Sequence, residues 1–586
     1  MRQPCWSERR VVAEPVPSPS PPSGLRNLLA QDARASRRYQ ESRFGYRPAT
    51  WWLDPGFVAV ALHRLGRWAR LRGHGFLARL LTQANTLVTG AEIPADSAIG
   101  PGLLLPTPLA LCLSGHAGRD LTMLALTGVG SRMREDDAAA GGALPVLGDG
   151  VSMGFLSGIM KAVRIGDGAT IAPGAGALFD MPAGSRGVSA VAPQAGDPPP
   201  VPKPRPHALP PCDHGRWSAT WRDYRADIDR TIAEMQRFGT GPASFRLRLR
   251  TALFSPLVAL LTYRIAHWLH LRGLRRIARA CALLNRLFHK VTIVPQACLG
   301  GGAFLPHLAG TLINARAGRN LTLYANTVCA PWHGAHAPLD EAPQLGDDVR
   351  IGAHGAIIGP VDIGDRVFLA MKVNLFDTVP GGQGVFSPMA RVQLGEAQAS
   401  PAQAPALPEP GAWSADALRR GDAQRRAAWM AQGRRIGLAG RIAVALYRRS
   451  HAHHAAGRLR RARWAWLANV YCNGIDIAPM SRIGPGLLID APAGIAFHGC
   501  AGRDLTLMAQ TIVGAELTAD RRSPSLEAAP ILGDGITLHP HAVVAGRIAV
   551  GDRSILYPGC TALSTVPSDV TLMPRPPRLR PVPEAR

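Results

Sequence analysis

The stretch LGDDVRIGAHGAIIGPVDIGD, from Leu345 to Asp365, places an aliphatic residue at every sixth position. Leucine or isoleucine stands at 345, 351, 357 and 363, and many of the intervening residues are small or turn-forming. A spacing of six fits neither a helix, with a period of about 3.6, nor an alternating strand, with a period of about two. It is typical of a coil of short strands, in which one aliphatic side chain per strand points into a narrow axis.

The same spacing occurs in three parts of the chain, each time as two ladders separated by an insertion. The insertions cover Gly128–Val146, Cys329–Gln344 and Val513–Ile531. Three faces of such strands form a triangular prism, with glycine, asparagine or aspartate at the sharp turns. The ladder residues are Ile93, Ile99, Leu105, Leu111, Ala117, Met123, Leu147, Met153, Ile159, Ile165 and Ile171; then Ile293, Leu299, Leu305, Thr311, Ala317, Leu323, Leu345, Ile351, Ile357, Ile363 and Leu369; then Ile477, Ile483, Ile489, Ile495, Ala501, Leu507, Leu532, Leu538, Val544, Val550 and Leu556.

Proline-rich segments divide the 586 residues into three units of similar size. Such segments are typical of extended linkers that have no core of their own. A shared phrase marks the units as internal repeats: it reads AGRDLT at Ala117–Thr122 and Ala501–Thr506, and AGRNLT at Ala317–Thr322. We therefore expect a disordered tail at 1–24, unit 1 at 25–187, a linker at 188–215, unit 2 at 216–394, a linker at 395–411, unit 3 at 412–573 and a basic tail at 574–586.

Each unit opens with a helical pattern, at Asp54–Gly73, Ser255–Gly273 and Leu438–Arg458. Apolar residues recur every three or four positions there, with arginines between them. The pattern predicts helices that pack on their own unit. A basic amphipathic face that touches a membrane surface is the alternative.

Composition narrows the class of partner. The net charge is +25 and favours anions such as phosphorylated cofactors or acidic lipids, although a genome that favours arginine would also produce it. Aromatic residues make up 6% of the chain, without a basic stacking platform, so we expect no nucleic-acid partner. The nine cysteines show no zinc or disulfide spacing, and we expect reduced thiols in the cytoplasm. No signal-peptide core or long apolar run is present.

The helical start, the phrase IPADSAIGPGLLL (Ile93–Leu105), the interrupted ladders and the closing DTVP (Asp377–Pro380) or STVP (Ser564–Pro567) form one combined pattern. It resembles the hexapeptide-repeat acyltransferases, in particular the serine acetyltransferase group and its sugar-modifying relatives. The resemblance implies a mainly β protein of three left-handed parallel β-helix units, each preceded by α-helices. Members of the family usually work as trimers with active sites between neighbouring prisms. Three units in one chain therefore imply an intramolecular pseudo-trimer; trimerisation between chains through one unit, or a non-cyclic arrangement, is the alternative.

The resemblance also implies transfer of an acetyl group from acetyl-CoA to a hydroxyl of an amino-acid or sugar-type acceptor, with a histidine as general base. The family phrase for this base matches FLPHLAGTLIN (Phe304–Asn314) and assigns the role to His307. The same position holds Thr107 in unit 1 and Ala491 in unit 3. We therefore expect one competent site, in unit 2.

Other family positions are kept only in part. The aspartate that orients the base corresponds to Glu92, Thr292 and Asp476, and a second histidine, which precedes a proline in serine acetyltransferases, is missing from all three units. The second absence argues against L-serine as acceptor. The candidate supporting residues are Glu92, Asp476 and Asp490; the candidates for an acceptor loop are Trp332, His333 and His336; and the candidates for binding acyl-CoA are Gly352, Ala353, Gly359 and Ala370.

Two functions stay open at this point. One is an O-acyltransferase without a metal, which acts on a small-molecule acceptor in a bacterial cytoplasm or at the inner face of the membrane. The other is a catalytically degenerate β-helix scaffold, in which the three loop histidine and tryptophan candidates are ordinary solvated residues. Loss of the base from two units favours the scaffold, and the retained phrase around His307 favours the enzyme.

Overall fold

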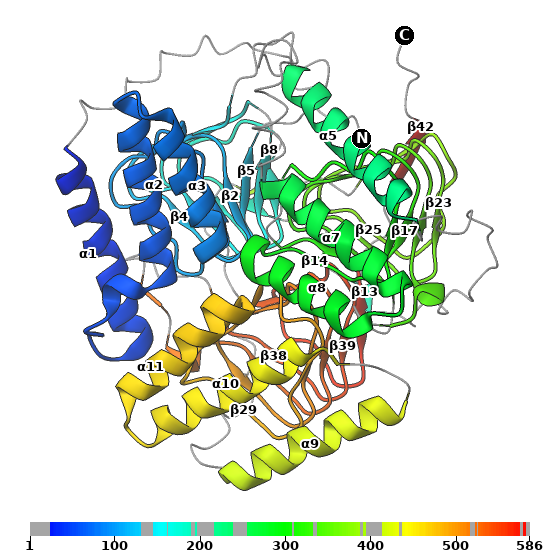
Figure 1. Cartoon of the computed structure of the whole chain (residues 1–586). Helices are drawn as coiled ribbons and strands as arrows, with labels where there is room; N and C mark the ends of the chain where they lie inside the picture. The colour runs from blue at the N-terminus through cyan, green and yellow to red at the C-terminus, as the bar shows by residue number, and fades with distance from the viewer. Residues whose placement is uncertain are drawn as a thin grey trace, which may run out of the picture.

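The computed structural model describes residues 24–130, 144–160, 162–177, 179–188, 194–195, 216–237, 255–306, 310–331, 337–386, 391–393, 413–432, 436–515, 522–523, 525–574 and 578–581. Three units lie around a common centre, and the helices of all three lie on the same side of the strands (Figure 1). The expected fold class, left-handed parallel β-helix units preceded by α-helices, is confirmed.

The predicted helices are confirmed as α2 (Pro55–Leu71), α7 (Ser255–Leu271) and α10 (Leu438–Ala455). Asp54 caps the N-terminus of helix α2, and its carboxylate accepts a hydrogen bond from the Gly56 amide at 3.1 Å. The further helical elements are α1 (Leu25–Phe44), η1 (Trp51–Leu53), α3 (Gly75–Thr89), α5 (Trp217–Arg237), α8 (Arg275–His289), η2 (Leu339–Glu341), α9 (Ala415–Ala431), α11 (Leu459–Ala468), the π-helical turn η3 (Asn469–Asn473) and η4 (Leu526–Ala528).

The strands of each unit form three parallel sheets, one for each face of a prism. Neighbouring strands in a face are one coil apart: Thr170 in β10 lies beside Ser152 in β7, a separation of three strands of six residues. The strands of unit 1 are β1 (Ala91–Glu92), β2 (Leu111–Leu113), β3 (His116–Ala117), β4 (Thr122–Met123), β5 (Gly128–Gly130), β6 (Val146–Leu147), β7 (Ser152–Met153), β8 (Gly158–Met160), β9 (Arg164–Ile165), β10 (Thr170–Ile171), β11 (Gly176–Ala177) and β12 (Arg186–Val188).

The other two prisms repeat this plan. The strands of unit 2 are β14 (Thr292–Ile293), β15 (Cys298–Leu299), β16 (Leu312–Ile313), β17 (Arg316–Ala317), β18 (Thr322–Leu323), β19 (Val328–Ala330), β20 (Gln344–Leu345), β21 (Arg350–Ile351), β22 (Ala356–Ile358), β23 (Asp362–Ile363), β24 (Phe368–Leu369), β25 (Asn374–Leu375) and β26 (Gln383–Phe386). The strands of unit 3 are β28 (Ile475–Ile477), β29 (Arg482–Ile483), β30 (Leu488–Ile489), β31 (Ile495–Phe497), β32 (Cys500–Ala501), β33 (Thr506–Leu507), β34 (Ile512–Gly514), β35 (Ile531–Leu532), β36 (Thr537–Leu538), β37 (Val543–Ala545), β38 (Ala549–Val550), β39 (Ile555–Leu556), β40 (Thr561–Ala562) and β41 (Thr571–Met573).

The predicted ladders form the cores of the prisms. Their side chains are buried in three separate clusters, one per unit, with Ala117 only partly buried and Thr311 buried as a polar member of its ladder. One aliphatic residue per strand therefore fills each axis, as the spacing of six predicts. The middle of each insertion lies outside the described residues.

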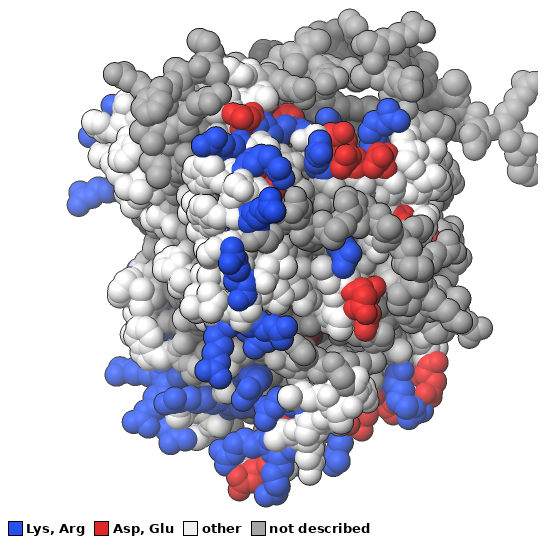
Figure 2. Space-filling model, turned by 45° about the vertical axis from the view of Figure 1, so that its right-hand side comes forward, with Lys and Arg blue, Asp and Glu red and all other residues white. Residues whose placement is uncertain are grey.

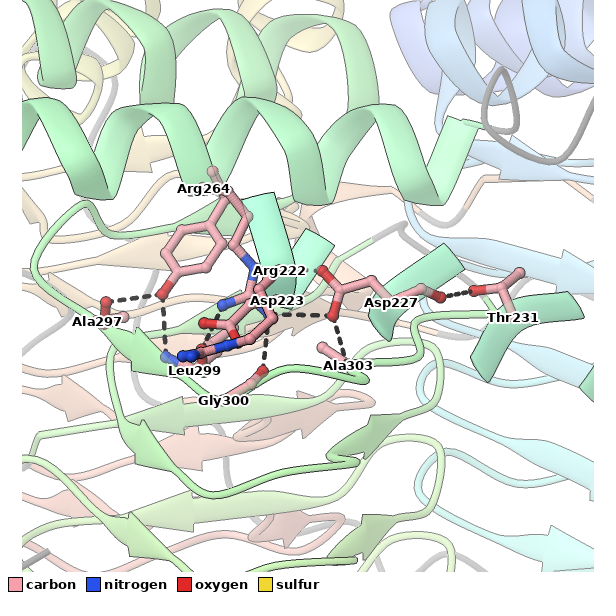
Figure 3. Close-up of polar contacts among 10 residues, drawn as sticks. Arg222, Asp223, Asp227, Thr231, Arg264, Ala297, Leu299, Gly300 and Ala303 are labelled. Carbon is pink, nitrogen blue, oxygen red and sulfur yellow. Dashed lines mark hydrogen bonds and ion pairs between the residues drawn. The ribbon is translucent and has the colours of Figure 1, made fainter. Parts of the chain in front are cut away.

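A buried ion pair fixes the helices to the prism in every unit, and Figure 3 shows it in unit 2. The Arg264 guanidinium on α7 bonds both carboxylate oxygens of Asp227 on α5, and it also donates to the carbonyls of Leu299 and Gly300. The same Asp227 accepts from the Ala303 amide at 2.8 Å. The equivalent pairs are Arg64 with Asp32 in unit 1 and Arg448 with Asp422 in unit 3.

Short strands beyond each prism connect the units in a ring. Strand β13 (Gln194–Ala195) pairs antiparallel with β41 of unit 3, β27 (Arg391–Gln393) with β12 of unit 1, and β42 (Arg578–Pro581) with β26 of unit 2. Strands β13 and β42 belong to segments that the sequence marks as a linker and a tail. Each of them gives backbone partners to an open sheet edge of a neighbouring unit.

Successive turn residues of the three units meet at the centre of the ring. The Asn326 side chain donates to the Ala110 carbonyl at 2.8 Å, and the Lys372 ammonium donates to the Ala175 carbonyl at 2.6 Å. Gln510 bonds the Gly310 carbonyl and His541. In a trimer of identical chains, the same residue would occupy the equivalent turn of all three units. We call such a set of three equivalent turn residues a layer. Here one layer holds Leu126, Asn326 and Gln510, and the next holds Leu156, His354 and His541, all in left-handed turns with φ between 54° and 62°.

His354 is a weak point of this central contact. Its ring is buried, and neither ring nitrogen has a hydrogen-bond partner among the described residues. Burial, together with the nearby Lys372 and His541, lowers the pKa of His354 well below its usual value. We expect His354→Leu, which copies Leu156, to raise the free energy of unfolding by about 1–2 kcal/mol, because it removes unsatisfied buried polar atoms.

The pH dependence provides a second readout of the same change. The unfolded chain takes up a proton at His354 as the pH falls below about 6.5, whereas the folded chain does not until much lower pH. Stability is therefore lost as the pH falls below about 6.5, and His354→Leu reduces that loss in denaturant titrations at pH 7.5 and 5. His541→Leu is the matched control and should destabilise, because it removes the partner of Gln510. Equal effects of the two changes would contradict the assignment.

One cysteine departs from the expectation of reduced thiols. Cys298 in β15 is disulfide-bonded. The other six cysteines that the structure describes are free.

Candidate active site at the junctions between units

Two sets of equivalent residues define the candidate site. We call Thr107, His307 and Ala491 the base position, and Glu92, Thr292 and Asp476 the orienting position. The orienting residues lie on β1, β14 and β28, the first strand of each prism. His307 lies outside the described residues, as do the loop candidates Trp332, His333 and His336.

Units 1 and 3 bring these two positions together. The Thr107 hydroxyl donates a hydrogen bond of 2.8 Å to Oδ2 of Asp476. Around this contact, turn residues of unit 1 such as Leu124 and Phe155 pack on Ala496 and Ile512, which lie in the same sheet of unit 3 as Asp476. At this junction the base position of unit 1 thus faces the orienting position of unit 3 and not the orienting position of unit 1 itself.

The other two junctions follow the same cyclic order. Ala491 of unit 3 packs on Leu312 and Val328, in the sheet of unit 2 that starts with the strand of Thr292. Unit 2 in turn contacts unit 1, where Met371 lies against Gly158. Gly158 belongs to the sheet that starts with β1, the strand of Glu92. Unit 1 therefore packs on unit 3, unit 3 on unit 2, and unit 2 on unit 1.

A small pocket lies at the junction of units 1 and 3, and an ion pair occupies its polar side. Arg43 on α1 donates to both oxygens of Asp476, at 2.9 and 2.6 Å, and the Trp466 indole donates to the same carboxylate at 2.7 Å. Burial alone would raise the pKa of Asp476, but the charge of Arg43 and these hydrogen bonds hold it below its usual value. The pocket is lined by Tyr39, Arg43, Pro106, Thr107, Leu124, Phe155, Asp476, Ala496, Phe497, His498, Val513, Gly514, Ala515 and Ser523.

This junction is poorly equipped for proton transfer. Threonine stands at the base position, and the Asp476 carboxylate is already saturated with donors. His498 lines the pocket, but burial and the charge of Arg43 lower its pKa to about 4. A base with a pKa this far below neutrality has little driving force to accept a proton. The site between units 1 and 3 is a closed structural contact.

The remaining candidates are placed as follows. Asp490 is buried directly after β30, next to Ala491. Gly352 and Ala370 follow β21 and β24 at the same corner of successive coils, 18 residues apart. A Cβ at Gly352 would lie 2.7 Å from the Met371 amide nitrogen, so close stacking of the coils by itself requires this glycine. Ala353 is half-buried in the turn after Gly352, and Gly359 follows β22 with a φ of 93°.

No sequence pattern indicated a role for Arg43 or Trp466. Arg43 lies on α1, upstream of the helical pattern that the sequence shows, and it reaches Asp476 across 433 residues of chain. Within the described ranges, no group of three or more histidine, cysteine, aspartate or glutamate side chains is arranged so that it could hold a metal ion.

No family model matches the chain. It is 32% identical over 141 residues to the serine acetyltransferase of Mycobacterium tuberculosis, which covers 24% of this chain and 60% of that enzyme. It is 31% identical over 132 residues to the serine acetyltransferase of Helicobacter pylori strain 26695, which covers 22% of this chain and 76% of that enzyme. A crystal structure of serine acetyltransferase from Brucella abortus aligns with 25% identity and a TM-score of 0.25, over 30% of this chain and 68% of that one. The chain thus spans between three fifths and three quarters of the length of these curated relatives.

Proposed function

Because this chain belongs to the serine acetyltransferase family, we propose that it transfers an acetyl group from acetyl-CoA to a hydroxyl of a small amino-acid or sugar-type acceptor. We place the competent site in unit 2, with His307 as general base. We also infer that the three units are tandem copies of one acyltransferase unit, since each matched stretch of a relative is shorter than one unit.

The contact between Thr107 and Asp476 supports this placement most directly. It pairs the base position of one unit with the orienting position of the neighbour on which that unit packs. Unit 2 packs on unit 1 in the same cyclic order. The proposal extends the pairing to that junction, where His307 is the base-position residue and Glu92 the orienting residue. This junction is the only one of the three whose two positions hold a histidine and a carboxylate.

Acetyl transfer of this kind requires a general base and a fixed orientation of the acceptor hydroxyl toward the thioester. The neutral imidazole of His307 takes the proton of the acceptor hydroxyl while the hydroxyl oxygen attacks the thioester carbonyl. The carbon–sulfur bond then breaks, and the proton passes to the departing CoA thiolate. The Glu92 carboxylate holds the imidazole in the right tautomer and stabilises its positive charge. The small residues Gly352, Ala353, Gly359 and Ala370 are the proposed surface along which the pantetheine arm of acetyl-CoA lies.

We propose that the acceptor contacts Trp332, His333 and His336. They belong to the insertion of unit 2, and such an insertion is the usual place for substrate contacts. The second histidine found in serine acetyltransferases is absent, so the proposal favours an acceptor other than L-serine. Identification of the acetylated product by mass spectrometry, after incubation with acetyl-CoA and either serine or a panel of sugars, tests this choice.

A scaffold without catalysis is the second candidate. The structure of the junction between units 1 and 3 favours it, because there the carboxylate is sealed by Arg43 and the base is a threonine. If all three junctions have been closed in this way, the chain does not bind acetyl-CoA at all. Calorimetric titration with acetyl-CoA separates the two candidates: measurable binding supports the transferase, and its absence, together with no acetylated product, supports the scaffold.

A further inference from the structure

The three helical hairpins carry a one-sided charge. The segments from α2 to α3 (55–89), from α7 to α8 (255–289) and from α10 to α11 (438–468) contain five, six and seven arginines, and no lysine, aspartate or glutamate. The whole chain, by contrast, has 66 basic and 41 acidic residues. Most of the excess positive charge of the protein therefore lies on these hairpins.

Many of these arginines point to solvent. Arg64, Arg264 and Arg448 are used in the buried ion pairs that hold the helices to the prisms. The exposed ones are Arg70, Arg72, Arg79, Arg272, Arg275, Arg276, Arg279, Arg441, Arg449, Arg458, Arg460 and Arg461. Figure 2 shows basic side chains gathered over the lower part of the molecule, at the height of α9, α10 and α11 in Figure 1, with few acidic ones among them.

Large apolar side chains are exposed between these arginines. Phe76 is 83% exposed and Leu71 is 67% exposed at the corner between α2 and α3, and Ile277 on α8 and Trp464 on α11 are more than half exposed. Among the described residues, all such exposed side chains except Leu563 lie on or beside helical elements. Exposed large apolar side chains are therefore concentrated on the helical side of the molecule, where they lie among exposed arginines.

We propose that this helical surface docks on an anionic phospholipid bilayer. Guanidinium groups bind phosphate oxygens, and leucine, phenylalanine and tryptophan side chains enter the boundary between headgroups and acyl chains. A second copy of the chain fits the surface poorly, because two such faces would bring the arginines of the hairpins together, and the hairpins themselves carry no acidic side chain. A nucleic acid would contact the arginines but would leave the exposed apolar side chains without an apolar partner. Contact is peripheral, since no helix in the described ranges is long and apolar enough to span a bilayer.

The test is flotation of the full chain with vesicles of phosphatidylcholine alone or with 30% phosphatidylglycerol added, a composition on the order of a moderately anionic membrane. We expect binding only to the anionic vesicles and weakening with salt, because exposed charges are screened. The triple variant Arg275→Glu/Arg276→Glu/Arg279→Glu should lower the partition coefficient by about tenfold or more. The matched control, Arg319→Glu/Arg350→Glu/Arg503→Glu, makes the same charge change on exposed arginines of the prisms and should bind nearly as well as wild type.

Four results would overturn the proposal. The first is no flotation of the wild type at low salt. The second is an equal loss of binding in the two triple variants, which would indicate attraction to net charge without a defined face. The third is tighter binding to duplex DNA than to anionic vesicles, and the fourth is self-association through the helices in sedimentation. Because all six substituted arginines are exposed, thermal unfolding of the variants should match that of wild type and exclude misfolding as the cause.

Discussion

His307→Ala is expected to lower kcat/KM for acetyl transfer by about 10²–10⁴-fold, the range usually lost with a general base. The acceptor hydroxyl then has to lose its proton to water, while binding of acetyl-CoA, which we propose to use residues other than His307, is retained. Steady-state assays of thiol release, with acetyl-CoA affinity measured separately, should therefore show a loss in kcat with little change in binding.

Thr107→Ala is the matched control for this prediction. It changes the base position of unit 1, where the carboxylate is saturated by donors and the residue at the base position is a threonine. Acetyl transfer should stay within about twofold of wild type, since no proton transfer is assigned to that junction. Activity that survives in His307→Ala but falls in Thr107→Ala would move the site to the junction of units 1 and 3.

Asp476→Ala is expected to lower the free energy of unfolding by about 3–5 kcal/mol, because removal of one partner leaves the buried guanidinium of Arg43 without compensation. Both side chains are less than 5% exposed. The Thr107 hydroxyl and the Trp466 indole lose their acceptor at the same time. Denaturant titration, followed by tryptophan fluorescence, measures the change.

Two further variants show whether the cost comes from burial. Asp96→Ala breaks the exposed pair of Asp96 with Arg70, which should cost no more than about 1 kcal/mol. The double variant Arg43→Met/Asp476→Leu removes the uncompensated charge and should recover part of the loss, whereas the Thr107 hydroxyl and the Trp466 indole stay without an acceptor. If Asp476→Ala costs as little as Asp96→Ala, the junction between units 1 and 3 does not form as described.

The prisms could be predicted from the sequence because their signal is local and repeated. A ladder such as Ile351, Ile357, Ile363 and Leu369 fixes one inward side chain per strand, and the three copies agree with one another. The helices α2, α7 and α10 were equally visible, since apolar residues recur with helical spacing in Pro55–Leu71 and its counterparts.

The junctions were not predictable in the same way, because they depend on contacts between residues hundreds of positions apart. The pairing of Asp476 with Thr107 and Arg43 follows from the cyclic order of the units, and no spacing in the sequence encodes that order. Strands β13 and β42 were equally hidden, since their partners are open sheet edges of other units and their composition is that of proline-rich linkers. The role of His307 is still a prediction from the phrase that surrounds it.

One chain is proposed to supply a complete acyltransferase site by itself. The most direct test is acceptor-dependent thiol release from acetyl-CoA, assayed on wild-type fractions that are separated by size and weighed by light scattering. We expect activity in the species of 62.3 kDa, the mass of a single chain. Activity that is absent from the single chain, or present only in larger assemblies, would contradict it.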